Sequence, residues 1–287
     1  MVELKELSTG DYTPDWCPGC GNFGIINALK RALVELGLEK HEVVIVSGIG
    51  CSSKLPQWIN TFGFHGIHGR GLPIGMGAKI ANKDLKVIII GGDGDVYGEG
   101  MDHFVEGLRK NVDVTLLVHN NEIYGLTKGQ TSPTTKKERP TKSTPYGRFD
   151  EPVNPLALAV SQKAPFVARS FGGDLKHLTK MLVEAISFKG FSYVDVMQPC
   201  ITFNKQTNFK WYRERVSDLQ EQGYKPNNLE KAFEKTMLDG EEIPIGLFYK
   251  DDSRKTYEEM HPVLKEKPLI KYNLKNVSVD KLMEEFC

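Results

Sequence analysis

The sequence predicts an α/β fold built on a doubly wound, mainly parallel sheet, followed by a charged C-terminal extension. Near-continuous apolar runs that end near glycine, asparagine or proline are typical of parallel strands buried on both faces. Segments with helical spacing of apolar residues lie between these runs, and this alternation indicates a doubly wound sheet. The runs that predict strands are residues 43–48, 87–92, 114–118 and 191–196.

Between the predicted strands, apolar side chains recur three and four positions apart, which is the spacing of one helix face. We therefore expect three helices among the strands, the first of which stops near Gly37. The positions that carry the three patterns are Ile25, Ile26, Leu29, Leu33 and Leu36; Phe104, Val105 and Leu108; and Leu178, Met181, Leu182 and Ala185.

The amino-acid composition of the chain changes at about residue 210. We assign residues 1–210 to the α/β domain and residues 211–287 to a charged extension, because 29 of the last 77 residues are Asp, Glu, Lys or Arg, against 45 of the first 210. The extension is expected to pack on a partner or on the core. Residues 125–155 form a long polar segment, and a loop of this length in a compact domain is either functional or disordered.

Composition argues against several classes of protein. The chain has 287 residues, in which 37 Lys plus Arg balance 37 Asp plus Glu, and zero net charge argues against general nucleic-acid binding. No apolar run approaches the ~18 residues that span a bilayer, and the N-terminus lacks the apolar core of a secretion signal. We therefore expect a cytoplasmic protein without membrane contact. Five cysteines in such a chain favour metal or redox chemistry over disulfide bonds.

Oxygen donors follow two of the predicted strands. Because the carboxyl ends of parallel strands share one edge, Asp93 and the pair Asn120-Asn121 are expected to lie close together. A carboxylate and a carboxamide suit Mg²⁺, which prefers oxygen ligands and usually keeps substrate phosphates in its shell. Each fragment alone indicates no more than a turn or a strand end, whereas their spacing after two strands favours a magnesium site.

Four of the five cysteines form a second pattern. Cys17 and Cys20 make a C-x-x-C knuckle, which alone is compatible with zinc, iron–sulfur or thiol redox chemistry. Cys51 and Cys200 each follow a predicted strand at the same edge, and four thiolates suit a [4Fe–4S] cluster. Either of these two taken singly is equally compatible with a small buried hydrophobic residue. Cys287, on the charged tail, is interpreted as a bystander.

The Gly-Asp-Gly motif at residues 92–94, followed by Asn120-Asn121, resembles the thiamine-diphosphate motif. Taken in order, five motifs strongly resemble the β subunit of 2-oxoacid:ferredoxin oxidoreductases, in the short archaeal and bacterial form. The resemblance covers residues 10–210 and includes the Gln-Pro-Cys segment at residues 198–200. The five motifs are residues 16–24 (WCPGCGNFG), 48–52 (GIGCS), 68–70 (HGR), 92–95 (GDGD) and 123–130 (IYGLTKGQ).

The resemblance implies a role for each motif. Asp93, the Asn121 side chain and the Ile123 carbonyl would hold Mg²⁺ on the cofactor's diphosphate. Lys54 is a candidate for the substrate carboxylate, with a solvated surface lysine as the alternative. The cysteines that would bind one [4Fe–4S] cluster are Cys17, Cys20, Cys51 and Cys200. The residues that would contact thiamine diphosphate are Ile49, Gly50, Cys51, Ser52, His68, Gly92, Gly94, Asp95 and Leu126.

The same resemblance implies the activity and the partners. A 2-oxo acid would be oxidatively decarboxylated to acyl-CoA and CO₂, with electrons passing through the cluster to ferredoxin. The glutamate that protonates the aminopyrimidine would come from an α (or α/γ-fused) subunit of the same enzyme. This chain alone is therefore expected to be inactive and to work in an αβ unit. The C-terminal extension and residues 125–155 are candidates for contacting that partner.

One departure from the family pattern stands at residues 97–100, Tyr-Gly-Glu-Gly, where a more apolar Ile-Gly stretch is common. It leaves every implied ligand in place and predicts altered packing below the diphosphate. Two alternatives stay open: a non-oxidative thiamine-diphosphate decarboxylase or carboligase with incidental cysteines, and a non-enzymatic metal-bearing electron-transfer or scaffold subunit. Pyruvate, 2-oxoglutarate, branched-chain and aryl 2-oxo acids all fit the sequence as substrates.

Overall fold

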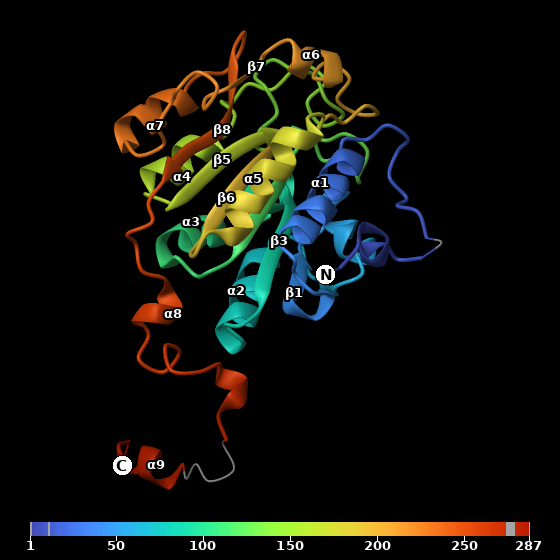
Figure 1. Ribbon diagram of the computed structural model, residues 1–287. Coiled ribbons are helices and arrows are strands. Elements are labelled where there is room, and N and C mark those ends of the chain that lie inside the picture. The colour runs from blue at the N-terminus through green and yellow to red at the C-terminus, as the bar shows by residue number, and fades with distance from the viewer. Residues whose placement is uncertain (1, 11, 274–278, 287) are drawn as a thin grey trace.

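The computed structural model describes residues 2–10, 12–273 and 279–286, so that Cys287 lies outside the described residues. Its strands are β1 (Val43–Ser47), β2 (Phe62–His65), β3 (Lys86–Gly92), β4 (Thr115–Asn120), β5 (Phe166–Phe171), β6 (Ser192–Met197), β7 (Val216–Asp218) and β8 (Ile243–Lys250). They form one sheet in the order β2-β1-β3-β4-β6-β5-β8-β7 (Figure 1). The first six strands in this order run parallel, β8 is antiparallel to β5, and β7 is parallel to β8. The predicted mainly parallel α/β sheet is confirmed.

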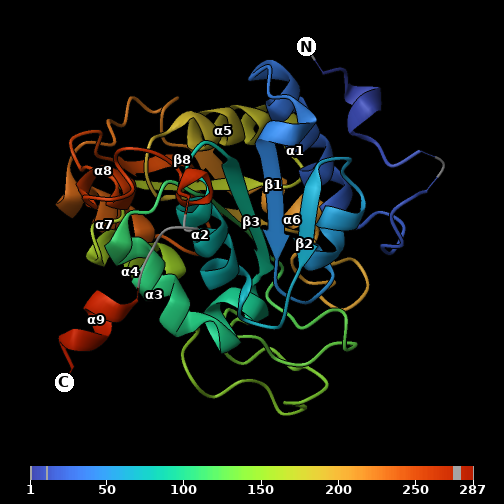
Figure 2. The ribbon, with the colours of Figure 1, turned by 90° about the horizontal axis from the view of Figure 1, so that it is seen from below.

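Helices cover both faces of this sheet. The helices of the described residues are α1 (Asn22–Glu35), α2 (Gly71–Ala81), α3 (Met101–Lys110), α4 (Pro155–Ser161), α5 (Leu175–Ser187), α6 (Phe209–Arg213), α7 (Leu229–Thr236), α8 (Tyr257–Met260) and α9 (Asp280–Glu284), of which α9 lies apart from the sheet (Figure 1). α1 and α5 lie on one face, and α2, α3 and α4 lie on the other (Figure 2). The three predicted helices correspond to α1, α3 and α5. Within the described ranges, no helix is both long enough and apolar enough to cross a membrane.

The strand β3 shows why a continuous apolar run forms a central strand. Its side chains alternate between the two faces of the sheet. Ile88 and Ile90 belong to the core layer that α1 and α5 cover, whereas Val87 and Ile89 belong to the layer that α2 and α3 cover. All four side chains are at most 2% exposed, so neither face of β3 meets water.

The C-terminal segment contributes two strands to the same sheet. β8 pairs with β5, and its residues Ile245 and Phe248 are buried. β8 is not among the strands predicted from the sequence, because Pro244 and Gly246 interrupt its apolar pattern. β2, β5 and β7 are not among the predicted strands either. The division of the chain at residue 210 stays a prediction.

The long loop between β4 and α4 is held by polar contacts. Over residues 121–154, the regular structure consists of one isolated bridge between Tyr124 and Gln130. The guanidinium of Arg148 is buried beneath the loop and donates hydrogen bonds to the carbonyl oxygens of Ser132, Pro133 and Thr135. These bonds fix the part of the loop that faces the end of β3.

Candidate functional site

The carboxyl ends of four neighbouring strands meet at one edge of the sheet. β1, β3, β4 and β6 are adjacent and parallel, with Gly92 of β3 opposite His119 and Asn120 of β4 opposite Met197. The residues that follow these strands therefore converge, as the sequence analysis expected. Two cavities open at this edge.

The first cavity, which we call the Asp93 cavity, has a volume of about 70 Å³. Its lining includes every residue that the sequence analysis assigned to thiamine diphosphate or Mg²⁺, and Tyr124, Gly125 and Thr127 in addition. These residues come from the ends of β1, β3 and β4 and from the turn before α2. The sheet thus brings the assigned residues together, while their roles as ligands stay predictions.

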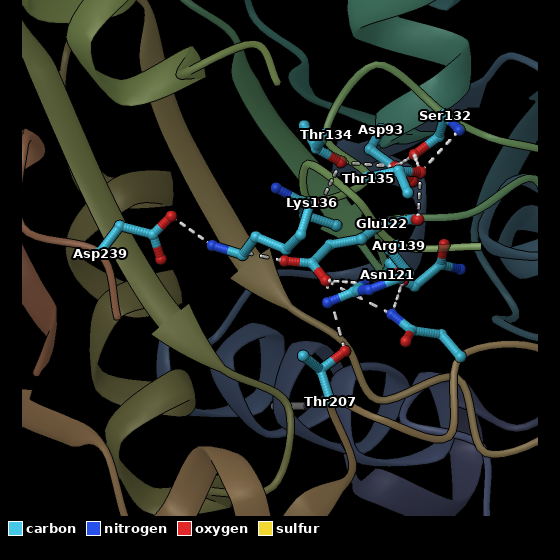
Figure 3. Close-up of polar contacts among 12 residues, drawn as sticks. Asp93, Asn121, Glu122, Ser132, Thr134, Thr135, Lys136, Arg139, Thr207 and Asp239 are labelled. Atoms are coloured by element: carbon cyan, nitrogen blue, oxygen red, sulfur yellow. Dashed lines mark hydrogen bonds and ion pairs between the residues drawn. The ribbon is translucent and has the colours of Figure 1, made fainter. Parts of the chain in front are cut away.

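Asp93 is buried at the end of β3, with 2% of its surface exposed. Its Oδ2 accepts hydrogen bonds from the hydroxyl groups of Ser132 and Thr134 (Figure 3). Burial raises the pKa of Asp93 from 3.8 to about 6, although both hydroxyl groups act in the opposite direction. A cation beside this carboxylate would favour its charged form, so the residue fits a magnesium ligand.

Asn121 and Ile123 follow β4 in a tight turn. Oδ1 of Asn121 accepts a 3.0 Å hydrogen bond from the N–H of Ile123, and its Nδ2 donates to Oε1 of Gln198 over 2.9 Å. Glu122, between them, has a φ of +60°, in the left-handed region that non-glycine residues seldom adopt. The turn therefore needs support from the Glu122 side chain or its surroundings.

The Glu122 carboxylate receives that support from several donors. Its Oε2 accepts hydrogen bonds from Arg139, from Asn204 over 3.4 Å and from Thr207 over 3.4 Å. The ammonium of Lys136 lies 3.9 Å from Oε1 (Figure 3). The Glu122 and Arg139 side chains are only 10% and 8% exposed, so their charges are paired out of water. This cluster ties the turn after β4 to the long loop and to the segment after Cys200.

Asp95 shapes the opposite wall of the Asp93 cavity. Its Oδ1 accepts hydrogen bonds from the N–H groups of Ile49 (3.1 Å) and Gly69 (2.7 Å), and it lies 3.1 Å from Nδ1 of His68. The carboxylate of Asp95 beside the ring raises the pKa of His68. A Cβ atom at Gly48 would lie 2.0 Å from Oδ2 of Asp95, so only glycine leaves room for this carboxylate.

The second cavity, which we call the cysteine cavity, has a volume of about 200 Å³ and is lined by all four grouped cysteines, Cys17, Cys20, Cys51 and Cys200. Burial raises the pKa of Cys20 to about 12 and that of Cys51 to about 11, and it also raises the pKa of Cys200. These thiols therefore keep their protons at neutral pH in the metal-free chain. Across the described chain, no three His, Cys, Asp or Glu side chains converge closely enough to hold one metal ion.

The two cavities share a wall. Cys51, Asn121, Gly125 and Leu126 line both of them. The indole N–H of Trp16 donates a 2.6 Å hydrogen bond to the carbonyl oxygen of Cys51, which fixes the backbone of this wall. A group bound in one cavity therefore lies next to a group bound in the other.

Lys54 lies at the cysteine cavity and does not line the Asp93 cavity. Its ammonium is 2.7 Å from Oδ2 of Asp15, in a pair whose side chains are 24% and 56% exposed. Such a partly exposed pair contributes about 0–1 kcal/mol. A role for Lys54 toward the substrate carboxylate stays a prediction.

Ser132, Thr134 and Gln198 have no predicted role, although each contacts a residue with one. Ser132 and Thr134 reach Asp93 from positions 39 and 41 residues further along the chain, where no pattern marks them. One feature of the sequence could have indicated a role for Gln198. It directly precedes Pro199-Cys200 in a segment that resembles the family. It lines the cysteine cavity.

A buried polar network explains the departure at residue 97. The Tyr97 hydroxyl lies 2.5 Å from that of Tyr193 and donates to Oδ1 of Asp195 over 3.1 Å. Nε of Arg169 donates to the other carboxylate oxygen of Asp195 over 3.0 Å. Burial raises the pKa of Tyr97 well above 10, so its hydroxyl stays protonated. Tyr97 thus combines ring packing against Phe104 with polar contacts through its hydroxyl, while altered packing below the diphosphate stays a prediction.

Comparison with known proteins gives two matching family models. The model for the thiamine pyrophosphate enzyme C-terminal TPP binding domain matches residues 48–196. The model for the C-terminal part of the pyruvate ferredoxin oxidoreductase beta subunit matches residues 200–266. Together they cover most of the sheet, every residue that lines the Asp93 cavity and much of the C-terminal segment, whereas β1 and the Cys17–Cys20 knuckle lie outside both matches.

The chain is also similar to individual proteins over most of its length. It is 45% identical over 263 residues to the 2-oxoacid:ferredoxin oxidoreductase subunit beta of a Sulfolobus species, covering 86% of each chain. It is 47% identical over 257 residues to that of Saccharolobus solfataricus, covering 85% of this chain and 84% of the relative. A solved 2-oxoglutarate:ferredoxin oxidoreductase from Magnetococcus marinus, with 2-oxoglutarate, coenzyme A and succinyl-CoA bound, matches with a TM-score of 0.90 and 34% identity, covering 99% of this chain and 96% of that one.

Proposed function

Because this chain belongs to the family of 2-oxoacid:ferredoxin oxidoreductase β subunits, we propose that it works with an α (or α/γ-fused) subunit to convert a 2-oxo acid and coenzyme A to acyl-CoA and CO₂. The electrons released pass through a [4Fe–4S] cluster to ferredoxin. One observation carries this proposal: the cavity of thiamine-type residues and the cavity of four cysteines adjoin, with Cys51 and Asn121 in their common wall.

Bound thiamine diphosphate would supply the electron sink for the loss of CO₂. The residues of this chain would hold and orient it. Asp93, the Asn121 side chain and the Ile123 carbonyl would bind Mg²⁺, and Gly92 and Gly94 would let the backbone approach the diphosphate. The residues that would surround the rest of the cofactor are Ile49, Gly50, Cys51, Ser52, His68, Asp95 and Leu126.

The four cysteines form the ligand set of one [4Fe–4S] cluster, in which each iron carries its own thiolate. The residues Cys17, Cys20, Cys51 and Cys200 line one cavity that adjoins the Asp93 cavity, and this position supports a cluster that takes electrons from the neighbouring site. Four thiolates can also bind zinc, so the metal content of the purified complex decides between the two.

A partner subunit is needed to complete the Asp93 cavity. Its volume of about 70 Å³ is well below the ~300 Å³ at which ligand pockets usually begin. No glutamate is among the described residues that line it, so the group that protonates the aminopyrimidine has to come from elsewhere. Both observations support an α subunit that closes the site, with this chain alone inactive.

The substrate is a 2-oxo acid, and 2-oxoglutarate is the first to test because the similar solved structure holds it. Pyruvate and branched-chain or aryl 2-oxo acids form the comparison panel. The cytoplasmic location stays a prediction from the sequence.

The test is anaerobic purification of this chain with its α subunit, followed by iron, sulfide and zinc analysis. EPR spectra are then recorded after addition of a 2-oxo acid and coenzyme A. We expect about four iron and four sulfide per β chain from this site, with a reduced-cluster signal that depends on both substrates. Because the α subunit can carry clusters of its own, Cys200→Ala must lower the iron content, while Cys287→Ala serves as the matched control.

Each other outcome contradicts part of the proposal. Zinc or no metal in place of iron would remove the cluster assignment and favour a non-oxidative decarboxylase or carboligase, which carbon–carbon bond formation without coenzyme A would detect. A cluster without bound thiamine diphosphate would instead favour an electron-transfer or scaffold subunit.

A further inference from the structure

We propose that Gln198 is a positioning residue that joins the two cofactor sites. Its side-chain amide donates a hydrogen bond to the cluster ligand Cys20 and fixes the amide of the magnesium ligand Asn121. This inference rests on the cluster and magnesium assignments of the proposed function. Gln198 directly follows β6, is 1% exposed and belongs to neither ligand set.

The bridge consists of three side chains in contact. Nδ2 of Asn121 donates to Oε1 of Gln198 over 2.9 Å, and Nε2 of Gln198 donates to Sγ of Cys20 over 3.2 Å. Nε2 also donates to the carbonyl oxygen of Pro199 over 3.3 Å, so both amide hydrogens have acceptors. Because Asn121 lines both cavities and Cys20 lines the cysteine cavity, the bridge spans the wall between the two sites.

Packing holds the Gln198 side chain in this place. A Cβ atom at Gly21 would lie 2.9 Å from Cγ of Gln198 and 2.9 Å from Cδ of Pro199. The N–H of Gly21 also donates to the carbonyl oxygen of Pro199 over 3.1 Å. The turn that leads to Cys200, which includes Gln198, therefore packs directly against the C-x-x-C knuckle that ends at Cys20.

The sulfur of Cys20 and the carbonyl oxygen of Pro199 together decide which way the Gln198 amide points. A thiolate accepts hydrogen bonds and donates none, so Gln198 must turn its NH₂ toward Cys20 and its oxygen toward Asn121. Asn121 must then turn its own NH₂ toward Gln198, which leaves Oδ1 as the atom that can bind a cation. Reversing either amide would set two donors or two acceptors against each other. Together with the N–H of Ile123, which donates to Oδ1, the bridge from Cys20 thereby holds Asn121 in the orientation proposed to bind magnesium.

The two ends of the bridge have separate measurable effects. An N–H donor stabilises the extra negative charge on the sulfur after reduction, so it raises the midpoint potential of the cluster. At the other end, partners that orient a metal ligand typically change metal affinity by 10–100-fold when they are removed. Loss of the Gln198 amide should therefore change both the midpoint potential of the cluster and the binding constant for Mg²⁺ and thiamine diphosphate.

Two substitutions separate these effects in the anaerobically purified αβ complex. Gln198→Met removes all three hydrogen bonds of the side chain while keeping a similar length, and we expect a lower midpoint potential and about tenfold weaker Mg²⁺-dependent thiamine diphosphate binding. Gln198→Glu keeps an acceptor for Asn121 but places a carboxylate beside the thiolate. We expect it to lower the potential while thiamine diphosphate binding stays close to that of the wild type. Gln222→Met, at an exposed glutamine, is the control.

The readouts are the midpoint potential from EPR-monitored redox titration, thiamine diphosphate binding from calorimetry, and iron per chain. If the wild-type complex carries no iron at this site, the cluster assignment fails and this inference fails with it. If the wild type carries the cluster and both Gln198 variants keep its potential and its binding constant, only the inference is overturned.

A further measurement uses only the wild-type complex, so its result does not depend on whether a variant folds. In wild-type complex labelled with ¹⁵N at the glutamine side-chain amides, pulsed EPR of the reduced cluster should detect hyperfine coupling to one amide nitrogen with an exchangeable hydrogen. Absence of that coupling in a cluster-bearing sample would overturn the bridge to Cys20.

Discussion

The hydroxyl of Thr134 donates a 2.7 Å hydrogen bond to Oδ2 of Asp93, the carboxylate proposed to hold Mg²⁺. Ser132 donates to the same oxygen. Both donors stand in the long loop after β4, whose local shape Arg148 fixes through hydrogen bonds to the carbonyl oxygens of Ser132, Pro133 and Thr135. The loop thus supplies polar support to the candidate magnesium site in addition to any contact with a partner.

Removing both hydroxyl donors should weaken cofactor binding. With Ser132→Ala and Thr134→Val combined, Asp93 stays buried but loses the two bonds that favour its charged form. We expect about tenfold weaker Mg²⁺-dependent binding of thiamine diphosphate to the αβ complex, measured by calorimetry. Ser161→Ala, at an exposed serine of α4, is the matched control. An unchanged affinity in the double variant would contradict the supporting role of the loop.

An added methyl group at Gly48 should close the Asp93 cavity. In Gly48→Ala the new Cβ would lie 2.0 Å from Oδ2 of Asp95, so that carboxylate must move and its bonds to Ile49 and Gly69 must change. We expect thiamine diphosphate affinity to fall by tenfold or more, while iron content stays unchanged.

The matched control is Gly77→Ala, in α2, where nothing outside the helix lies within 4 Å of the added carbon. We expect unchanged affinity and an unchanged or higher melting temperature, because alanine in a helix is favoured over glycine by about 0.5–1 kcal/mol. If Gly48→Ala and Gly77→Ala bind thiamine diphosphate with equal affinity, the absence of a side chain at Gly48 is not needed for cofactor binding.

Burial of Asp93 predicts a pH dependence of stability in the metal-free complex. Its pKa of about 6 lies above the value of 3.8 for the free side chain, so the folded state holds more protons between these pH values. Stability therefore falls as pH rises through that window, by up to about 3 kcal/mol, and the loss is complete above pH 6.

We expect Asp93→Asn to melt at a higher temperature than the wild type at pH 7 in EDTA without thiamine diphosphate. This difference should vanish toward pH 4, where both side chains are neutral. Saturating Mg²⁺ and thiamine diphosphate should reverse the order at pH 7. A difference in melting temperature that is the same at pH 4 and pH 7 would rule out the charge of Asp93 as its cause.

The buried pair of Glu122 and Arg139 predicts a non-additive response. Arg139→Met leaves the Glu122 carboxylate buried without its main cationic partner, which typically destabilises a protein by about 3–5 kcal/mol. We expect a marked drop in melting temperature and weaker thiamine diphosphate binding, because Glu122 holds the turn between Asn121 and Ile123.

Adding Glu122→Gln to Arg139→Met removes the uncompensated charge and should restore part of the lost stability. Differential scanning calorimetry of the two single variants and the double variant measures this coupling. Strictly additive losses would show that the pair does not interact in the folded protein.

Several features of this protein follow from its sequence alone. The runs at residues 43–48, 87–92, 114–118 and 191–196 became β1, β3, β4 and β6, because only strands covered on both faces need continuous apolar side chains. Their parallel arrangement requires their carboxyl ends to share an edge, so Asp93 and Asn121 had to meet. The cysteines at strand ends had to meet there for the same reason.

Contacts between distant segments were decided only by the tertiary structure. β8 joins the sheet by antiparallel pairing with β5, although Pro244 and Gly246 interrupt the apolar run that would indicate a strand. Ser132 and Thr134 reach Asp93 from a loop without periodicity, and Gln198 touches Asn121 and Cys20 across 77 and 178 residues of chain. Periodic patterns report which face of an element is buried, because burial repeats along the element. A single side-chain hydrogen bond has no such repetition, so it emerges only when the packed chain brings its two partners within reach.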